Sequence, residues 1–457
     1  MLSRILRKCR LKEDGVPIGD AVKVTELYSA KPRIQRIVLP DDLRTTHMIT
    51  FGTTGCGKTR LLEHMVDRDI RDGKNIVIID PKGDEDLLKR VVATAKDTGR
   101  FDEILFASPV YPHLSVRFNP LAHYIRPEEI VQHVIACLPV SAKEPFFTEV
   151  AKEIAHTVTF SMEYLHRRQG RRFEPTIGDL HRLTTYRSIQ GIIKELDTLR
   201  GDAEAEGWKG RLTALVGGSE EYFAKISSSL RTTLSQLSLG SIGEVISSVR
   251  TNEVLERYEA GERCILVVWT GALMFRDPAL SLSRLIVSMI QALVGRLYAR
   301  QNKFRPPLML YIDEASNVFY AGIEDMFNKA RGAGVAIHAF TQSVADIYAR
   351  IGKENARVIL DNANTKVFFK VNDPETSAYV ASVIGETDEP TATYSMEGDL
   401  RLMATGSKAL IEEADAVRLK PRQFFCVCRH EAFKGRTLNV TPVTLELAFD
   451  VEPPPPF

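Results

Sequence analysis

Cysteine is scarce in this sequence, and none of it has metal-binding spacing. The 457-residue chain contains six cysteines and no C-x-x-C pair, which argues against a zinc site. Cys426 and Cys428 share one face of a strand-like run, but no second ligand pair accompanies them. Scattered cysteines of this kind are typical of a protein in a reducing cytosol. The six are Cys9, Cys56, Cys137, Cys264, Cys426 and Cys428.

Long apolar segments are also missing. No run of about 18 or more apolar residues occurs, so the sequence predicts no transmembrane helix. No signal peptide is evident either. The segment Met1–Lys12 is basic and has one apolar face if it is helical. Two interpretations of it are open: a helix that lies on a membrane surface, or a solvated terminus.

A strong net charge is the third absence. The formal net charge is +1, so any nucleic-acid contact must come from a local patch. The densest basic run, His166–Arg172, has two open interpretations, a contact to phosphates or a solvated loop. The rest of the composition is that of a soluble globular protein, with 44% hydrophobic and 26% charged residues. The length allows about two or three domains.

What the sequence does contain is one strong motif. Gly52–Thr59 fits G-x-x-x-x-G-K-[ST], the phosphate-binding P-loop. The preceding His47–Phe51 is typical of a buried strand, and the following Arg60–Asp72 of an amphipathic helix. This strand–loop–helix context is what the motif requires. The predicted phosphate-binding residues are Gly52, Thr53, Thr54, Gly55, Cys56, Gly57, Lys58 and Thr59.

The residue types of this loop indicate its chemistry. Its glycines let backbone N–H groups turn inward around phosphate oxygens, and the helix N-terminus adds a partial positive charge. We expect Lys58 to reach the β- and γ-phosphates and the Thr59 hydroxyl to bind Mg²⁺. The loop therefore predicts a nucleoside triphosphate and Mg²⁺ as ligands.

Strands alternate with helices on both sides of a long helical stretch. This alternation predicts an α/β fold with a mostly parallel sheet and right-handed crossovers. Between about Glu128 and Leu255 helical periodicity dominates, which predicts an all-α insertion. Strands are expected at Asn75–Asp80, Glu103–Ala107, Cys264–Thr270, Leu308–Asp313, Val335–Phe340, Lys366–Val371 and Gln423–Cys428.

These patterns divide the chain into five segments. A basic N-terminal segment and loop (1–33) precede the first part of a nucleotide-binding domain (34–125). The all-α insertion domain (126–258) follows. The second part of the nucleotide-binding domain (259–446) then leads to a proline-rich tail (447–457), which cannot form a helix or a central strand.

A P-loop site needs an acidic partner on a neighbouring strand, and two candidates exist. Asp80 ends a hydrophobic strand but is followed by proline, whereas Asp313 is followed by Glu314. Hydrolysis needs one carboxylate near Mg²⁺ and a second group that orients or deprotonates the attacking water. Because only the second pair supplies both, we assign Asp313 to the metal and Glu314 to the water. The alternative for this pair is a helix N-cap.

Two further residues are candidates for a catalytic role. Gln342 follows the strand Val335–Phe340, at the carboxyl end where open α/β sheets bind ligands, and could sense the γ-phosphate. Arg331 lies before a glycine-rich turn and could act on a neighbouring subunit's γ-phosphate. Both have plainer interpretations, a polar turn residue for Gln342 and a helix C-terminal cation for Arg331.

Several short motifs follow the P-loop in a fixed order. They are Ile79–Asp84, Phe118–Leu121, Tyr311–Ala315, Ala330–Gly332, Thr341–Ser343, Asp361–Lys366 and Asn372–Thr376. Together with the P-loop they resemble one family, the TraG/TraD-type coupling proteins of conjugative type IV secretion systems, within the HerA/FtsK group of P-loop motors. The resemblance spans about residues 34 to 430.

The resemblance implies a RecA-like domain interrupted by an all-α domain, and a homo-hexameric ring with ATP and Mg²⁺ bound between subunits. It implies that ATP hydrolysis drives single-stranded DNA, with its attached relaxase, toward the secretion channel. It also implies contacts with relaxosome proteins, with the ATPases and inner-membrane components of the channel, and a location at the cytoplasmic face of the bacterial inner membrane.

One feature departs from this family, whose members usually carry N-terminal transmembrane helices. The sequence predicts none, so direct membrane anchoring is in doubt, and Met1–Lys12 could be a juxtamembrane remnant. Two other functions stay open beside the DNA motor. They are a docking adaptor that uses nucleotide only to set its oligomeric state, and a protein-secretion ATPase.

Overall fold

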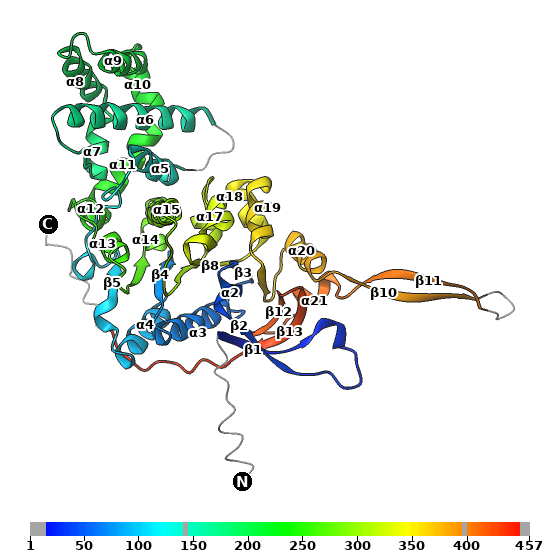
Figure 1. Cartoon of the computed structure of the whole chain (residues 1–457). Helices are drawn as coiled ribbons and strands as arrows, with labels where there is room; N and C mark the ends of the chain where they lie inside the picture. Colours follow the sequence, from blue (N-terminus) through cyan, green and yellow to red (C-terminus); the bar gives the residue numbers. More distant parts are fainter. Residues whose placement is uncertain (1–14, 140–144, 395–399, 448–457) are drawn as a thin grey trace.

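The computed structural model describes residues 15–139, 145–394 and 400–447, and these carry the account that follows (Figure 1). The basic segment Met1–Lys12 and residues 448–457 of the proline-rich tail lie outside the described residues. The strands are β1 (Val16–Lys23), β2 (Gln35–Leu39), β3 (Met48–Phe51), β4 (Asn75–Asp80), β5 (Ile104–Ala107), β6 (Ile265–Trp269), β7 (Leu308–Ile312), β8 (Val335–Thr341), β9 (Thr365–Phe368), β10 (Glu386–Tyr394), β11 (Leu400–Ala409), β12 (Gln423–Cys428) and β13 (Glu431–Thr437).

Eleven of these strands form one sheet in the order β2-β1-β13-β12-β9-β3-β8-β7-β4-β6-β5. The seven strands from β9 to β5 run parallel, and β12, β13, β1 and β2 continue the sheet as antiparallel strands. The P-loop strand β3 is central, between β9 and β8. The prediction of an α/β fold with a mostly parallel sheet is therefore confirmed.

The helices in order are α2 (Asp41–Arg44), α3 (Lys58–Arg71), α4 (Glu85–Asp97), α5 (Pro127–Cys137), α6 (Pro145–Arg168), α7 (Ile177–Leu183), α8 (Tyr186–Asp197), α9 (Ala203–Leu215), α10 (Glu220–Ile226), α11 (Ser228–Ser238), α12 (Gly240–Ile246), α13 (Glu253–Glu259), α14 (Ala272–Phe275), α15 (Asp277–Ala299), α16 (Ala315–Val318), α17 (Glu324–Lys329), α18 (Val344–Ile351), α19 (Lys353–Asn362), α20 (Pro374–Ile384) and α21 (Glu413–Val417). Short 3₁₀ turns are η1 (Val24–Glu26), η2 (Phe101–Glu103), η3 (Pro112–Leu114) and η4 (Ala330–Ala333).

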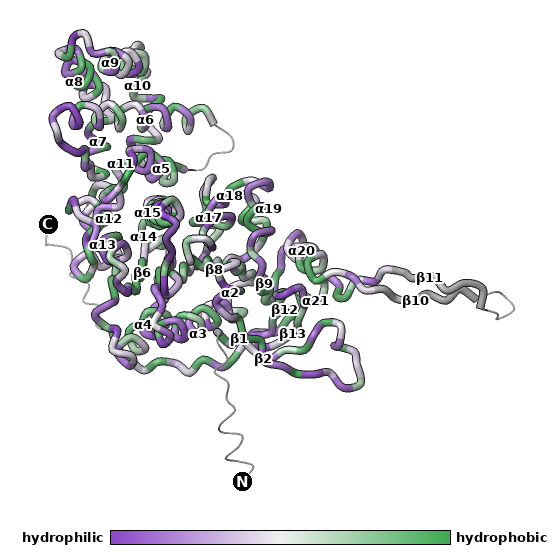
Figure 2. Tube along the Cα trace, in the orientation of Figure 1, coloured by the Kyte–Doolittle hydropathy of each residue, from purple (hydrophilic) through white to green (hydrophobic). Residues whose placement is uncertain are grey.

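Helices cover both faces of the sheet, as a buried parallel sheet requires (Figure 1). Alternate residues of β4 enter opposite cores. Ile76 and Ile78 pack with the helices α3 and α4, whereas Val77 and Ile79 pack in the core that includes α15. Figure 2 shows hydrophilic and hydrophobic residues alternating along α3 and α4, because each of these helices has one face on the sheet and one in solvent.

Between residues 126 and 258 the described elements are helices only, α5 to α13. Most of them gather in a unit beside the sheet, with α5 packed on α15 (Figure 1). Two details differ from the predicted helices. The apolar periodicity of the sequence predicts one continuous helix over Glu220–Leu237, whereas the structure has two, α10 and α11, which meet at Ser227. Helix α9 was not predicted, because its hydrophobic periodicity is weak.

A long hairpin, β10–β11, projects from the body and pairs only with itself within the described residues (Figure 1). The sequence did not predict it. Its β10 segment has Thr and Tyr but also a proline and three acidic residues, so no alternating apolar pattern marks a strand. The antiparallel strand β13 was not predicted for a related reason, because glycine and charged residues are uncommon in strands and are typical of loops.

Helix α15 is, in the described part of the chain, the one helix long and apolar enough to cross a membrane by length and composition alone. However, 72% of that apolar window is buried inside the structure. Side chains such as Leu285, Ile290 and Leu293 pack in the main core. Because Arg284 and several serines interrupt it, the segment is no uninterrupted apolar run. We conclude that α15 is a core helix of this fold.

A buried ion pair lies beneath the P-loop helix. Arg44 donates from Nη1 and Nη2 to the two carboxylate oxygens of Asp69, each at 2.6 Å, and both side chains are fully buried. The hydroxyl of Tyr311 on β7 donates to Asp69, and Arg44 Nε donates to His338 on β8 at 3.2 Å. Burial by itself would raise the pKa of Asp69, but the Arg44 guanidinium offsets this and holds the pKa below its usual range. The cluster thus ties α3 to β7 and β8, the three elements that lead to the candidate site.

We expect Asp69→Asn to lower the free energy of unfolding by about 3–5 kcal/mol, because it removes the fully buried carboxylate that pairs with Arg44. Asp41→Asn is the matched control, since Asp41 lies 3.7 Å from the same guanidinium and also contacts Lys74, but is 40% exposed. Its loss should cost about 1 kcal/mol or less. Urea unfolding of both variants, followed by circular dichroism, measures the difference. Equal urea midpoints for the two variants would show that the buried carboxylate contributes no more to the free energy of unfolding than the exposed one.

Candidate functional site

The loop between β3 and α3 has a backbone that only glycine accepts at key points. Gly55 has φ 76° and Gly57 has φ 116°, both in the left-handed region. At Gly52 an added Cβ would lie 2.6 Å from Cys56 Sγ and 2.7 Å from Phe369 Cβ. The predicted glycine positions are therefore needed for the loop to close, and α3 begins at Lys58 directly after the turn.

Backbone hydrogen bonds from neighbouring segments fix the position of this loop. Gly52 N donates to Thr341 O on β8 at 3.2 Å, and Thr53 N donates to Lys370 O at 2.8 Å. Arg422 N donates to Cys56 O at 2.8 Å. The Cys56 thiol is 4% exposed, and burial raises its pKa. It packs behind the loop rather than into the cavity, so its part in phosphate binding is limited to its backbone.

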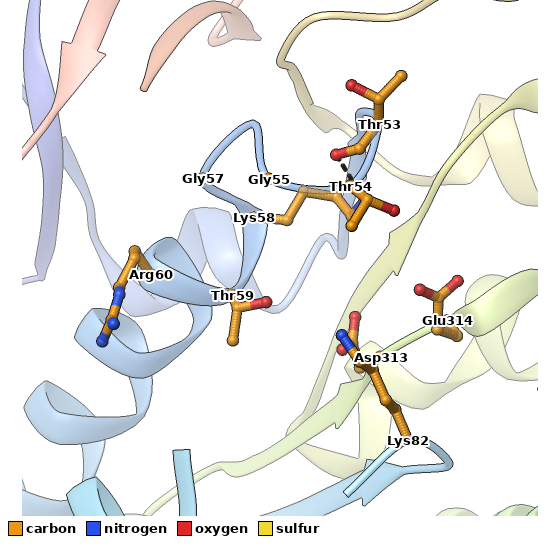
Figure 3. Close-up of a pocket in the computed structure, with 10 residues that line it drawn as sticks. All are labelled: Thr53, Thr54, Gly55, Gly57, Lys58, Thr59, Arg60, Lys82, Asp313 and Glu314. Carbon is orange, nitrogen blue, oxygen red and sulfur yellow. Dashed lines mark hydrogen bonds between the residues drawn. The ribbon is translucent and has the colours of Figure 1, made fainter. Parts of the chain in front are cut away.

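A cavity of about 380 Å³ opens in front of the loop (Figure 3). Lys58 lies at its floor, 8% exposed, and its amino group donates to the carbonyls of Gly52 and Thr53. Among the predicted phosphate-binding residues, Gly52 and Cys56 are not part of the lining. The lining residues are Thr53, Thr54, Gly55, Gly57, Lys58, Thr59, Arg60, Lys82, Asp313 and Glu314.

The two acidic candidates have different environments. Asp80 accepts hydrogen bonds from the backbone N–H groups of Lys82 and Gly83, each at 2.9 Å, and of Asp84 at 2.5 Å, so it shapes its own loop. Asp313 lines the cavity and is 7% exposed. Burial and the charges of Asp80 and Glu314 raise the pKa of Asp313 to about 7. This placement supports the choice of Asp313 as the metal ligand, because its carboxylate lines the cavity whereas that of Asp80 is bound to its own loop.

Glu314 occupies a strained backbone conformation, with φ 46° and ψ 44°. A non-glycine residue in the left-handed region costs free energy, and such residues are concentrated at functional sites. Its carboxylate accepts hydrogen bonds from Gln342 Nε2 at 3.2 and 3.4 Å. Both side chains also line a second cavity of about 240 Å³. The structure thus brings Glu314 and Gln342 into contact at the cavity mouth.

Arg331 lies away from this cavity. It belongs to η4, which precedes β8, while Asp313 follows the end of the parallel strand β7. Because β7 and β8 are parallel, a residue that precedes β8 and a residue that follows β7 lie at opposite ends of these strands. The seven residues of β8, at about 3.3 Å per residue, place the two roughly 20 Å apart. Arg331 is exposed and close enough to His47, at the start of β3, to help burial lower the pKa of that imidazole. Arg331 does not complete the site of its own chain.

The basic run His166–Arg172 is divided by its contacts. Arg167 pairs with Glu204 at 2.7 Å, and Arg168 lies 3.9 Å from Asp202. These two arginines are engaged within the helical unit. In contrast, Arg171 and Arg172 line a cavity of about 440 Å³ together with Arg182 and Arg250. Any phosphate contact made by this run would therefore involve its second half.

Two family models match parts of the chain. The model described as the TraM recognition site of TraD and TraG matches residues 307–418, and the central domain of helicase HerA matches residues 22–135. The type 4 coupling protein DotL of Legionella pneumophila is 22% identical over 91% of this chain. The chain spans 60% of the length of that relative.

Solved structures agree on the fold. An unbound form of the bacterial conjugative coupling protein TrwBdeltaN70 superposes with a TM-score of 0.66 at 18% identity, covering 96% of this chain and 92% of the TrwBdeltaN70 chain. TrwB with the ATP analogue ADPNP gives 0.66 at 16% identity, covering 95% and 97%. The chain is thus similar to type IV coupling proteins in sequence and in fold. VirB4 of Thermoanaerobacter pseudethanolicus shares the fold more distantly, with a TM-score of 0.55, 12% identity, and coverage of 93% and 97%.

Two residues of the cavity lining were not predicted as site residues. Arg60 follows the P-loop motif, and Lys82 lies in the Asp80–Asp84 loop after β4. The sequence carried a signal for the second, because parallel strands end at one edge of the sheet and Lys82 closely follows the end of β4. The signal needed the strand order, which places β4 next to β7 and so brings Lys82 beside Asp313.

The residues present fit a Mg²⁺ ion shared with a triphosphate. In the ranges that the structure describes, no three His, Cys, Asp or Glu side chains converge as a preformed metal site. Mg²⁺ is usually held by one or two carboxylates together with substrate phosphates. Thr59 and Asp313 both line the cavity. Burial, together with the charges of Asp80 and Glu314, raises the pKa of Asp313, and a bound cation would favour its ionised form.

Proposed function

We propose that this chain is an ATP-hydrolysing coupling protein that drives single-stranded DNA transfer in conjugation through a type IV secretion system. The observation that carries the proposal is the cavity in which the P-loop faces Asp313 and Glu314. Its setting in the fold of TrwB, whose structures include complexes with ADPNP and with ADP and Mg²⁺, supports ATP and Mg²⁺ as the ligands.

The roles of the residues follow from their positions. Lys58 and the loop N–H groups bind the phosphates, and the helix N-terminus of α3 adds positive potential. Mg²⁺, when bound, neutralises charge that develops on the phosphates. Thr59 and Asp313 are positioned to hold that ion. Glu314 orients and deprotonates the attacking water. Gln342, which follows β8 and contacts Glu314, senses the γ-phosphate and couples its loss to a movement of β8.

Completion of the site requires a second subunit. Arg331 is exposed at the edge of the sheet opposite its own cavity, so it is free to enter the cavity of a neighbour. A homo-hexameric ring with sites between subunits supplies that arrangement at every site. The division into a nucleotide-binding domain (34–125 and 259–446) and an all-α insertion (126–258) is part of this proposal, and the helical unit beside the sheet supports it.

The remaining parts of the proposal concern partners and place. The ring recruits relaxase-bound DNA and relaxosome proteins and passes single-stranded DNA to the channel, in contact with its ATPases and inner-membrane components. The match to the TraM recognition site of TraD and TraG supports a relaxosome contact within residues 307–418. We place the protein at the cytoplasmic face of the bacterial inner membrane.

The test is ATP turnover and particle size measured with and without single-stranded DNA. We expect DNA to promote a ring and to raise the hydrolysis rate at least several-fold. Binding to DNA should weaken steeply with added salt, because phosphate contacts release counterions. An assembled ring without turnover would favour the docking adaptor. Turnover with absent or salt-insensitive DNA binding would favour the protein-secretion ATPase.

A further inference from the structure

Three cationic side chains line the nucleotide cavity, and they differ in their partners. Lys58 donates to the loop carbonyls of Gly52 and Thr53. Arg60 is engaged with Glu63 and Asp86, each at 2.9 Å. Lys82, within the part of the chain that the structure describes, makes no ion pair and no side-chain hydrogen bond. Of the three cationic side chains, Lys82 is therefore the one available to bind a ligand.

Hydrogen bonds on both sides of Lys82 fix the backbone that carries it. The Asp80 carboxylate accepts from the N–H groups of Lys82 and Gly83, each at 2.9 Å. Pro81 O accepts from Ala272 N at 2.7 Å. Gly83 has φ 80°, and a Cβ there would meet the Trp269 ring at 3.5 Å. A long cationic side chain thus projects from an ordered base.

The direction of Lys82 is toward the phosphate loop. Figure 3 shows its side chain extending from the β4 end past Asp313, on the side of the cavity opposite Thr54. The P-loop and Lys58 occupy the near side, where the helix N-terminus of α3 attracts phosphates. A group that meets Lys82 must therefore extend across the cavity from the loop to the acidic edge formed by Asp313 and Glu314.

We propose that Lys82 binds the terminal phosphate of a nucleoside triphosphate, so that the site distinguishes the triphosphate from the diphosphate. This inference rests on the proposed ATP site and adds a second phosphate-binding lysine to it. A terminal phosphate next to Asp313 and Glu314 would meet two carboxylates, and the Lys82 ammonium offsets their repulsion. A diphosphate is one phosphate shorter and does not reach Lys82 from the loop.

The experiment measures nucleotide affinity rather than turnover. A fluorescent ADP is displaced from the full chain, with Mg²⁺ present, by a non-hydrolysable ATP analogue and, separately, by ADP. For Lys82→Met, which keeps the apolar stem, we expect the analogue to bind about tenfold more weakly and ADP to bind within a factor of about two of the parent chain. Lys82→Arg should retain most of the preference.

Arg60→Met is the matched control, because Arg60 lines the same cavity but is already paired. It should leave the ratio of the two affinities unchanged. An equal loss for both nucleotides in Lys82→Met, or no loss for either, would overturn the proposal. Failure of the ATP site itself gives a different result, because Lys58→Ala would then leave ADP binding intact.

Discussion

Replacing Glu314 by glutamine is expected to lower the rate of ATP hydrolysis about 10²- to 10⁴-fold while ATP still binds. The carboxylate is the group placed to take a proton from the attacking water, and glutamine keeps its shape without its basicity. The strained left-handed backbone at Glu314 and its contact with Gln342 mark it as a positioned residue. The measurement combines a phosphate-release assay on the DNA-bound protein with nucleotide displacement.

Glu85→Gln serves as control, because Glu85 is a solvent-exposed carboxylate at the start of α4 and its one contact here is with Lys89. It should leave hydrolysis within a factor of about two of the parent chain. Unchanged DNA-stimulated hydrolysis in Glu314→Gln would contradict the proposed role of this carboxylate. The group that activates the water would then be Gln342 or a residue of a neighbouring subunit.

Replacing Arg331 by alanine is expected to lower hydrolysis about 10³-fold or more in the assembled ring, although Arg331 lies outside its own cavity. The physical reason is loss of a cation that would stabilise charge on the transferring phosphate of a neighbour. Lys329→Ala is the matched control. Lys329 precedes the same turn, is 61% exposed and pairs with Asp325 on its own helix.

Mixed rings separate an action on the neighbour from an action within the subunit. Neither Arg331→Ala nor Lys58→Ala rings should hydrolyse ATP efficiently. In a mixture, an Arg331→Ala subunit offers an intact P-loop to the intact Arg331 of a Lys58→Ala neighbour. We expect activity to return at those interfaces. Verified mixed rings that stay inactive would count against an arginine supplied in trans.

The strongest sequence prediction succeeded because it depended on local chemistry. Gly52–Thr59 needs glycines where φ is positive and a helix that starts at Lys58, and both requirements are visible in the order of the residues. The central strands were also predictable, since β4 and β7 are continuous apolar runs that a parallel sheet buries on both faces. The assignment of roles to Asp313, Glu314, Gln342 and Arg331 stays a prediction that the experiments above test.

Other features escaped prediction because their cause is not local. The hairpin β10–β11 and strand β13 lack alternating apolar residues, so backbone pairing rather than side-chain pattern defines them. The division between α10 and α11 at Ser227 has no marker in the apolar periodicity of the sequence. Lys82 was read as part of a loop motif, since its position in the cavity depends on which strands are neighbours.

The sequence by itself determined that this protein has a phosphate-binding loop, an α/β fold with a parallel sheet, and an ordered set of coupling-protein motifs. These follow from residue type and spacing along the chain. Only the tertiary structure decided that Glu314 touches Gln342, that Lys82 lines the cavity without an ion pair to any described residue, and that Arg331 lies at the opposite end of the strands. The physical reason is strand order, because crossovers place segments far apart in sequence at one edge of the sheet or at opposite edges.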